Sequence, residues 1–135
     1  MRRTELQISL SALENNLKVI KSFTNASVQG VVKANFYGLF DDKMHEIIEQ
    51  NVESYAVITI DEAVSLRKLT SKPILLFQGV HEQNDYEMIE ENNLDFTIHS
   101  SWQLEGLSDF NLQNSRIWLK PVSYTHLTLP TTIEV

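Results

Sequence analysis

The sequence predicts an α/β fold, namely about the first five parallel strands, with intervening helices, of a TIM-type (β/α)8 barrel. Three observations favour this fold class. Short runs rich in Val, Ile and Phe recur at intervals of roughly 20 residues, segments of helical periodicity lie between them, and the middle runs are apolar on both faces. An open, doubly wound sheet is the alternative for such units. Because a complete barrel needs about 250 residues, a chain of 135 residues holds about half of one.

Five runs carry the strand signal. Each is rich in β-branched or aromatic residues, and most are bounded by polar or turn residues. We expect strands at 28–35, 55–60, 74–78, 96–99 and 116–120.

The helices are indicated by apolar residues three and four positions apart near 13–20, 44–48 and 63–69, and more weakly over 82–92. Three short sequences also predict capping boxes, in which a Ser or Thr hydroxyl accepts a backbone N–H three residues on while Glu or Gln reaches back. The boxes are Ser11 with Glu14, Thr59 with Glu62, and Ser100 with Gln103. We assign Trp102 and Trp118 to the core rather than to ligand stacking.

Composition excludes several classes of function. Eleven Lys and Arg against 18 Asp and Glu give a formal charge of −7, whereas nucleic acid and anionic membranes require a basic face. The absence of cysteine excludes a disulfide framework, a thiolate metal site and a Cys nucleophile. The histidines lack metal-ligand spacing, so no metal is expected. With neither a signal-peptide h-region nor an apolar run of membrane-span length, the expected location is the cytoplasm.

The last 14 residues, 122–135, break the βα pattern, since they contain one charge and no helical period. The codons GTC-TCT-TAT-ACA-CAT-CTG-ACG-CTG-CCG-ACG of a transposase-type sequencing adapter translate to VSYTHLTLPT, which matches residues 122–131 at every position. We therefore expect residues 1–121 to be the N-terminal part of a truncated barrel domain, and 122–135 to be a non-native tail from adapter read-through. An ordinary Thr-rich edge strand is the other interpretation of this segment.

The octapeptide VVKANFYG at 31–38 is the most informative motif for chemistry. Strand alternation predicts that Val31, Lys33 and Asn35 share one face, with Lys33 near the carboxyl end of its strand, which is the catalytic end of a barrel. A lysine that points into an apolar barrel is desolvated, which lowers its pKa and makes its amine a nucleophile toward aldehydes. Four residues of extended strand span roughly 13 Å, so we expect Gly38 to turn the chain back and bring the Tyr37 phenol toward the site.

This motif resembles the signature V-V-K-A-N-x-Y-G of the alanine racemase family, pyridoxal-phosphate enzymes in which it ends the first barrel strand. The resemblance runs through residues 5–120. The segment 6–17 is similar to the family's strand-then-helix opening. Tyr-Ala-Val at 55–57 with Asp-Glu-Ala at 61–63, Pro-Ile-Leu-Leu at 73–76 and Ile-Trp-Leu-Lys at 117–120 resemble later barrel units in the same order.

The resemblance implies roles for three residues. Lys33 would bind pyridoxal 5'-phosphate covalently and then act as one of two bases at the substrate α-carbon. Tyr37 would donate a hydrogen bond to the cofactor phosphate. Lys120 matches a lysine that is carbamylated in some members, although a solvent-facing charge at a strand end explains it equally well. The chain departs from the family at Leu39-Phe40, where a small pair such as His-Gly is usual.

The function that the resemblance implies is racemisation of L- and D-alanine for peptidoglycan precursor synthesis, by a cytoplasmic homodimer that binds neither nucleic acid nor membrane. The second base, a tyrosine of the partner subunit, would lie beyond Pro121, as would the substrate arginine, so we expect the 135-residue chain itself to be inactive. Three alternatives stay open: a serine or broad-specificity racemase, a non-catalytic pyridoxal-phosphate barrel protein, and a half-barrel without cofactor.

Overall fold

The computed structural model describes residues 5–121, so the expected tail at 122–135 lies outside the described residues. Five strands form one parallel sheet in the order β1-β2-β3-β4-β5, which confirms the predicted partial (β/α) barrel. In chain order the elements are α1 (Leu10–Phe23), β1 (Gln29–Val31), α2 (Lys33–Tyr37), α3 (Asp42–Asn51), β2 (Ser54–Val57), α4 (Ile60–Arg67), β3 (Ile74–Leu76), α5 (Asp85–Asn92), β4 (Asp95–Ile98), α6 (Ser101–Gly106), a 3-10 turn (Leu107–Asp109) and β5 (Ile117–Leu119).

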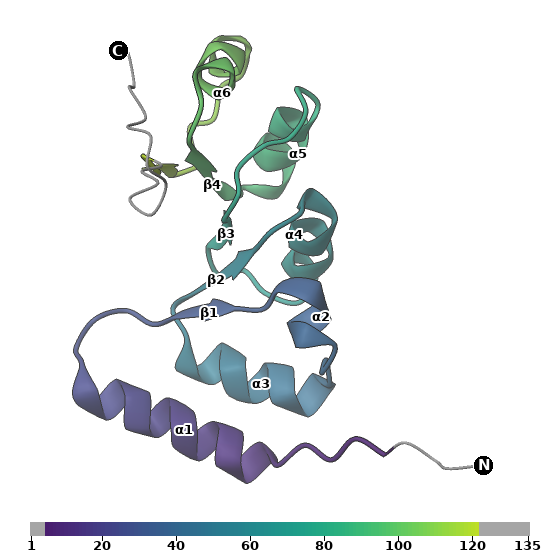
Figure 1. Cartoon of the computed structure of the whole chain (residues 1–135), viewed down its shortest axis with the longest axis vertical. Coiled ribbons are helices and arrows are strands. Elements are labelled where there is room, and N and C mark those ends of the chain that lie inside the picture. Colours follow the sequence, from purple (N-terminus) through teal and green to yellow (C-terminus); the bar gives the residue numbers. More distant parts are fainter. Residues whose placement is uncertain (1–4, 122–135) are drawn as a thin grey trace, which may run out of the picture.

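The core lies between the sheet and the helices that follow its strands, and Figure 1 shows α4, α5 and α6 stepping along one side of the strands. The three middle strands are almost wholly buried. Tyr86 of α5 is fully buried, and its ring meets those of Phe96 and Phe110 at centroid distances of 5.9 and 5.3 Å. Helix α1 packs on α3 and buries no residue completely. Helix-on-sheet packing is therefore the main source of burial.

The other face of the sheet is open. Val31 of β1 and all three residues of β5 are exposed, as is Phe77, which follows β3. Trp118 in β5 is 50% exposed and Trp102 in α6 is 42% exposed, so the assignment of both tryptophans to the core is wrong. Apolar strand residues left in contact with water are typical of a barrel that has not closed.

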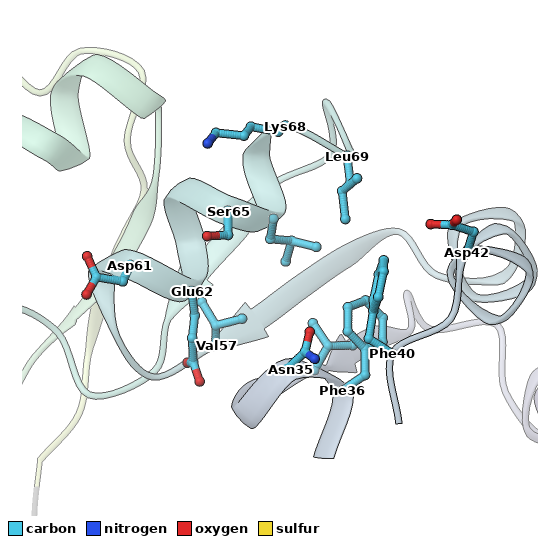
Figure 2. Close-up of a pocket in the computed structure, with 12 residues that line it drawn as sticks. Asn35, Phe36, Phe40, Asp42, Val57, Asp61, Glu62, Ser65, Lys68 and Leu69 are labelled. Carbon is cyan, nitrogen blue, oxygen red and sulfur yellow. The ribbon is translucent and has the colours of Figure 1, made fainter. Parts of the chain in front are cut away.

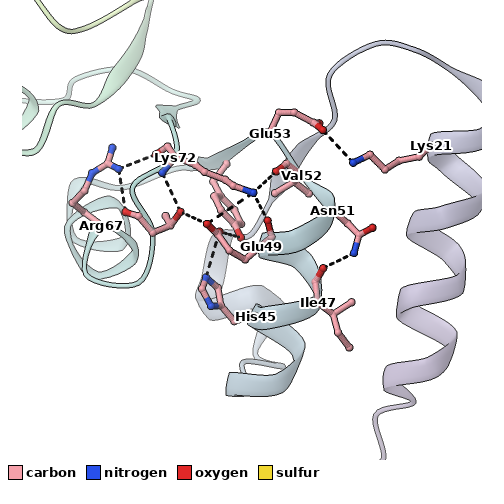
Figure 3. Close-up of polar contacts among 11 residues, drawn as sticks. Lys21, His45, Ile47, Glu49, Asn51, Val52, Glu53, Arg67 and Lys72 are labelled. Carbon is pink, nitrogen blue, oxygen red and sulfur yellow. Dashed lines mark hydrogen bonds and ion pairs between the residues drawn. The ribbon is translucent and has the colours of Figure 1, made fainter.

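Polar contacts join the loops at the amino ends of the strands, opposite the end that carries Lys33 (Figure 3). Glu49 accepts hydrogen bonds from the Tyr55 hydroxyl at 2.7 Å and from Thr70 at 2.9 Å. Burial and the bond to Glu49 raise the pKa of Tyr55 well above its ordinary value, so the phenol remains a donor. The Arg67 guanidinium donates to four carbonyl groups, two in the loop before β3 and two at the carboxyl end of α5.

Two of the predicted capping boxes are wrong. The cap of α1 is Ser9, whose hydroxyl accepts the Ala12 N–H, and Ser11 lies inside the helix. Ser100 precedes α6 but makes no side-chain cap hydrogen bond. The Thr59 box is present in full at the start of α4. The described residues before α1 also form no strand, in contrast to the expected strand-then-helix opening.

Candidate functional site

The predicted strand at 28–35 is wrong in its second half. Strand β1 ends at Val31, and Lys33 begins the five-residue turn α2. Lys33 therefore follows the carboxyl end of β1 instead of alternating with Val31 and Asn35 on one face. Its position at the carboxyl edge of the sheet, which is the predicted catalytic end, is unchanged.

Turn α2 is left-handed. Ala34, Asn35, Phe36 and Tyr37 have φ values of 51°, 52°, 57° and 58°, and Gly38 follows at 76°. Each L-residue in this conformation costs roughly 1–2 kcal/mol, and left-handed residues normally occur singly. Such strain persists only where surrounding contacts determine the backbone. Contacts around α2 must therefore hold the turn in this conformation.

Packing holds one side of the turn. Phe36 is 6% exposed, and its ring meets Phe40 edge-on at 5.2 Å and His45 at 5.9 Å between centroids. Phe36 belongs to the hydrophobic core beneath α2, and Phe40 packs against it. Burial of Phe36 on the helix side leaves Tyr37, which is 58% exposed, on the open side of the turn.

A carboxylate holds the other side. Oε1 of Glu62 accepts the Ala34 N–H at 2.7 Å, while Oε2 accepts the N–H groups of Ile58 at 2.9 Å and Thr59 at 3.1 Å. Burial opposes ionisation of Glu62, but these hydrogen bonds outweigh it and lower the pKa below its ordinary value. One ionised side chain thus joins the turn after β1 to the start of the helix after β2.

Lys33 and Tyr37 approach each other across the turn. Lys33 Nζ lies 5.9 Å from the centroid of the Tyr37 ring, and Lys33 is half-buried rather than enclosed. The chain reverses immediately after Lys33, so the extended span of roughly 13 Å does not exist. A primary amine beside a phenolic donor has the chemistry to hold pyridoxal phosphate, since the amine can condense with its aldehyde and the phenol can donate to its phosphate. The residues present fit that group.

A second group of residues meets at the carboxyl ends of β3, β4 and β5. Lys120 Nζ lies 4.8 Å from the Phe77 ring centroid, and the Lys120 N–H donates to the Ile98 carbonyl at 2.9 Å. Lys120 is exposed, so its strand-end position is as expected and its carbamylation stays a prediction. The His99 ring lies 3.1 Å from the Gln78 carbonyl oxygen.

The pocket in Figure 2, of about 510 Å³, lies between α2 and α4. Phe36, Phe40, Leu66 and Leu69 provide its apolar walls, and Glu62 reaches its edge. Neither Lys33 nor Tyr37 lines it, so this pocket is not the place where the amine and the phenol meet. Within residues 5–121 no group of acidic and histidine side chains could hold a metal ion.

The Glu62–Ala34 contact was not predicted from the sequence. The Thr59-x-x-Glu62 pattern identified the helix start, but a side chain 28 residues away along the chain gave no local signal at Ala34. No helix in the described part of the chain has the length and apolar character needed to cross a membrane.

The fold and the site define a class: a parallel (β/α)-barrel domain with a half-buried lysine at the carboxyl edge of its first strand. The family model for the alanine racemase N-terminal domain matches residues 8–123. The chain belongs to the alanine racemase family.

Three relatives illustrate the similarity. An alanine racemase of Haemophilus influenzae is 37% identical over 117 residues, which cover 84% of this chain and 32% of the relative. The biosynthetic alanine racemase of Pseudomonas aeruginosa has a similar structure, with a TM-score of 0.67 and 29% identity over 74% of this chain and 28% of that one. A histidine racemase of Leuconostoc mesenteroides has a TM-score of 0.64 and 26% identity, over 74% and 27%. The chain spans about a third of the length of the curated relatives it matches.

Proposed function

We propose that residues 1–121 are the N-terminal part of the catalytic barrel of a pyridoxal-phosphate-dependent alanine racemase, a cytoplasmic homodimer that provides D-alanine for peptidoglycan precursors. The observation that carries this proposal is the meeting of Lys33 and Tyr37 at the carboxyl edge of β1. Membership of the alanine racemase family supports alanine as the substrate.

In the proposed mechanism Lys33 has two tasks. Its Nζ would hold the cofactor, and its amine would take or return a proton at the substrate α-carbon on one face. Bound pyridoxal phosphate supplies an electron-withdrawing ring that stabilises negative charge at that carbon. The Tyr37 hydroxyl would donate a hydrogen bond to the phosphate and so help to hold the group.

Trapping with borohydride tests the assignment of Lys33. The product of the intact gene is incubated with pyridoxal phosphate, reduced and digested, and the modified peptide is identified by mass spectrometry. We expect the pyridoxyl group on Lys33, its loss in Lys33→Ala, and its retention in Lys68→Ala, which removes an exposed lysine of the same region. Trapping that survives Lys33→Ala would refute the proposal.

A second candidate function is racemisation of another amino acid. The structural similarity to a histidine racemase supports this second candidate, since the sequence identity to that protein, 26%, equals the identity to the alanine racemase of Acinetobacter baumannii. Chiral chromatography after incubation with L-alanine, L-serine or L-histidine separates the two. Conversion of alanine as the best substrate supports the first proposal, and preference for serine or histidine contradicts it. Trapping on Lys33 without conversion of any of them would indicate a non-catalytic cofactor-binding barrel.

The 135-residue chain alone is a different case. Strands β1 and β5 each have one neighbour within the described sheet, so the barrel is open on both sides. We propose that this chain by itself is inactive and prone to association through its free edges and exposed apolar face. Resequencing the locus across codon 121 would establish whether 122–135 is an adapter tail or a genuine end.

A further inference from the structure

We propose that Glu62 is a positioning residue for Lys33: its carboxylate holds the left-handed turn in the conformation that presents the Lys33 amine. The inference rests on the proposed function of Lys33 and adds a residue outside the VVKANFYG motif. Its basis is the junction in which one carboxylate bonds both to Ala34, directly after Lys33, and to the start of α4.

The turn needs such an anchor. Four successive non-glycine residues from Ala34 to Tyr37 are left-handed, and three hydrogen bonds within the turn, from the N–H groups of Phe36 and Gly38, are local. Local bonds of this kind do not select the unfavourable hand, because a right-handed turn would form equivalent ones. External contacts must select it, and the described contacts are the buried Phe36 ring and the Ala34 N–H on Glu62.

The position of the anchored N–H connects it to the lysine. The peptide group that joins Lys33 to Ala34 carries the hydrogen that Glu62 accepts at 2.7 Å, a short, charge-assisted bond. Fixing that peptide plane after the end of β1 restricts the ψ angle of Lys33, and with it the direction in which the Lys33 side chain leaves the backbone. Release of the bond would let the amine and the Tyr37 phenol separate.

Glu62→Gln removes the anchor selectively. Two N–H groups at the helix start face Oε2 and one faces Oε1. The amide oxygen of glutamine is therefore expected to accept the two N–H groups at the helix start. Its NH2 group then faces the Ala34 N–H, and two donors cannot form a hydrogen bond. Thr59→Ala is the matched control, because it removes the hydroxyl cap of α4 and leaves the three backbone N–H bonds to Glu62 in place.

Two readouts measure the effect in the product of the intact gene. The pyridoxal phosphate concentration that gives half-maximal borohydride trapping on Lys33 is expected to rise about tenfold in Glu62→Gln and less than about twofold in Thr59→Ala. Hydrogen exchange of the peptide that contains Ala34 is expected to accelerate in Glu62→Gln alone. If Glu62→Gln fails to fold, Glu62→Asp replaces it; the same loss is expected there, since the side chain is one methylene too short to reach both sides.

A rescue variant distinguishes positioning from helix capping. Ala34→Gly relieves the positive φ at that residue, so Glu62→Gln combined with Ala34→Gly is expected to recover most of the lost trapping. Lost capping would not be recovered in this way. Two outcomes would overturn the inference and leave the proposed role of Lys33 intact. One is trapping in Glu62→Gln equal to that of the unmodified protein, and the other is no recovery in the double variant. Failure to trap Lys33 in the unmodified protein would instead overturn the proposed function.

Discussion

Gly79→Ala and Gly38→Ala form a matched pair that tests the backbone on both sides of the site. Both glycines are left-handed, with φ values of 74° and 76°. A Cβ on Gly38 would meet no atom within 4 Å, whereas a Cβ on Gly79 would lie 2.1 Å from the Thr97 carbonyl oxygen and 3.2 Å from Nε2 of Gln103. The pair therefore separates the cost of conformation from the cost of a clash.

The magnitudes follow from these contacts. Gly38→Ala is expected to lower the free energy of unfolding by about 1–2 kcal/mol, the conformational cost alone. Gly79→Ala carries the same cost, and β3 and β4 must also separate by about 1 Å to restore an ordinary contact distance of about 3.3 Å. Overpacking of that kind adds about 1–3 kcal/mol, which gives about 2–5 kcal/mol in total. The separation would also weaken the bonds from Thr97 to Phe77 at 3.0 Å and from Gln103 to Val80 at 2.9 Å.

Urea unfolding of the product of the intact gene measures the free energy of unfolding of both variants. Hydrogen exchange of peptides from β3 and β4, measured in the same protein, establishes that the unfolding transition is that of the barrel. Gly38→Ala should shift the midpoint less than Gly79→Ala, and only Gly79→Ala should accelerate exchange in β4. Equal costs for the two variants would refute the close approach of Gly79 to Thr97. A Gly38→Ala variant without any cost would refute the left-handed conformation at the end of α2.

Two further predictions concern the carboxylates. Asp95, which is 5% exposed, accepts a hydrogen bond from the Arg116 backbone N–H at 2.8 Å and pairs with the Arg116 guanidinium at 2.7 Å. Asp95→Ala should therefore lower the free energy of unfolding by about 2 kcal/mol in the same urea assay. Arg116→Ala should lower it by less, because the Arg116 side chain is 62% exposed. Because the pKa of Glu62 is lowered in the folded state, its stabilisation is present above the ordinary value of 4.5 and is lost as the pH falls through the lower folded value. Stability measured across that acid range should therefore fall less steeply in Glu62→Gln, and an unchanged slope would contradict the cause given for the shift.

The sheet was predictable because each strand carries its own signal. Each of the five predicted runs overlaps an observed strand, and the sequential parallel order follows from alternating strands and helices. Strand ends were less predictable. The run at 28–35 continues in residues with high strand propensity, yet the chain leaves the sheet after Val31, because burial of Phe36 and the bond from Ala34 to Glu62 override local preference.

The candidate site was predictable only in part. The resemblance at 31–38 identified Lys33 and Tyr37, and the structure places them 5.9 Å apart, between Nζ and ring centroid. The means by which they approach was not predictable, since in ANFY only Asn favours the left-handed region, and it does so normally as a single residue and not in a run of four. Contacts between βα units, such as that of Glu62, depend on tertiary geometry and leave no periodic pattern in the sequence.

The sequential strand order also has a consequence for synthesis on the ribosome. Each strand pairs with the one that emerges about 20–25 residues later, so the sheet can grow by addition at one edge without waiting for the end of the chain. At translation rates of about 5–20 residues per second, one unit is added every few seconds at most. The Lys33 turn is then left without its carboxylate until Glu62, 29 positions later, has been translated and has started α4. The proposed active-site lysine is thus among the first functional residues made, and it takes its final conformation only when the second βα unit has folded.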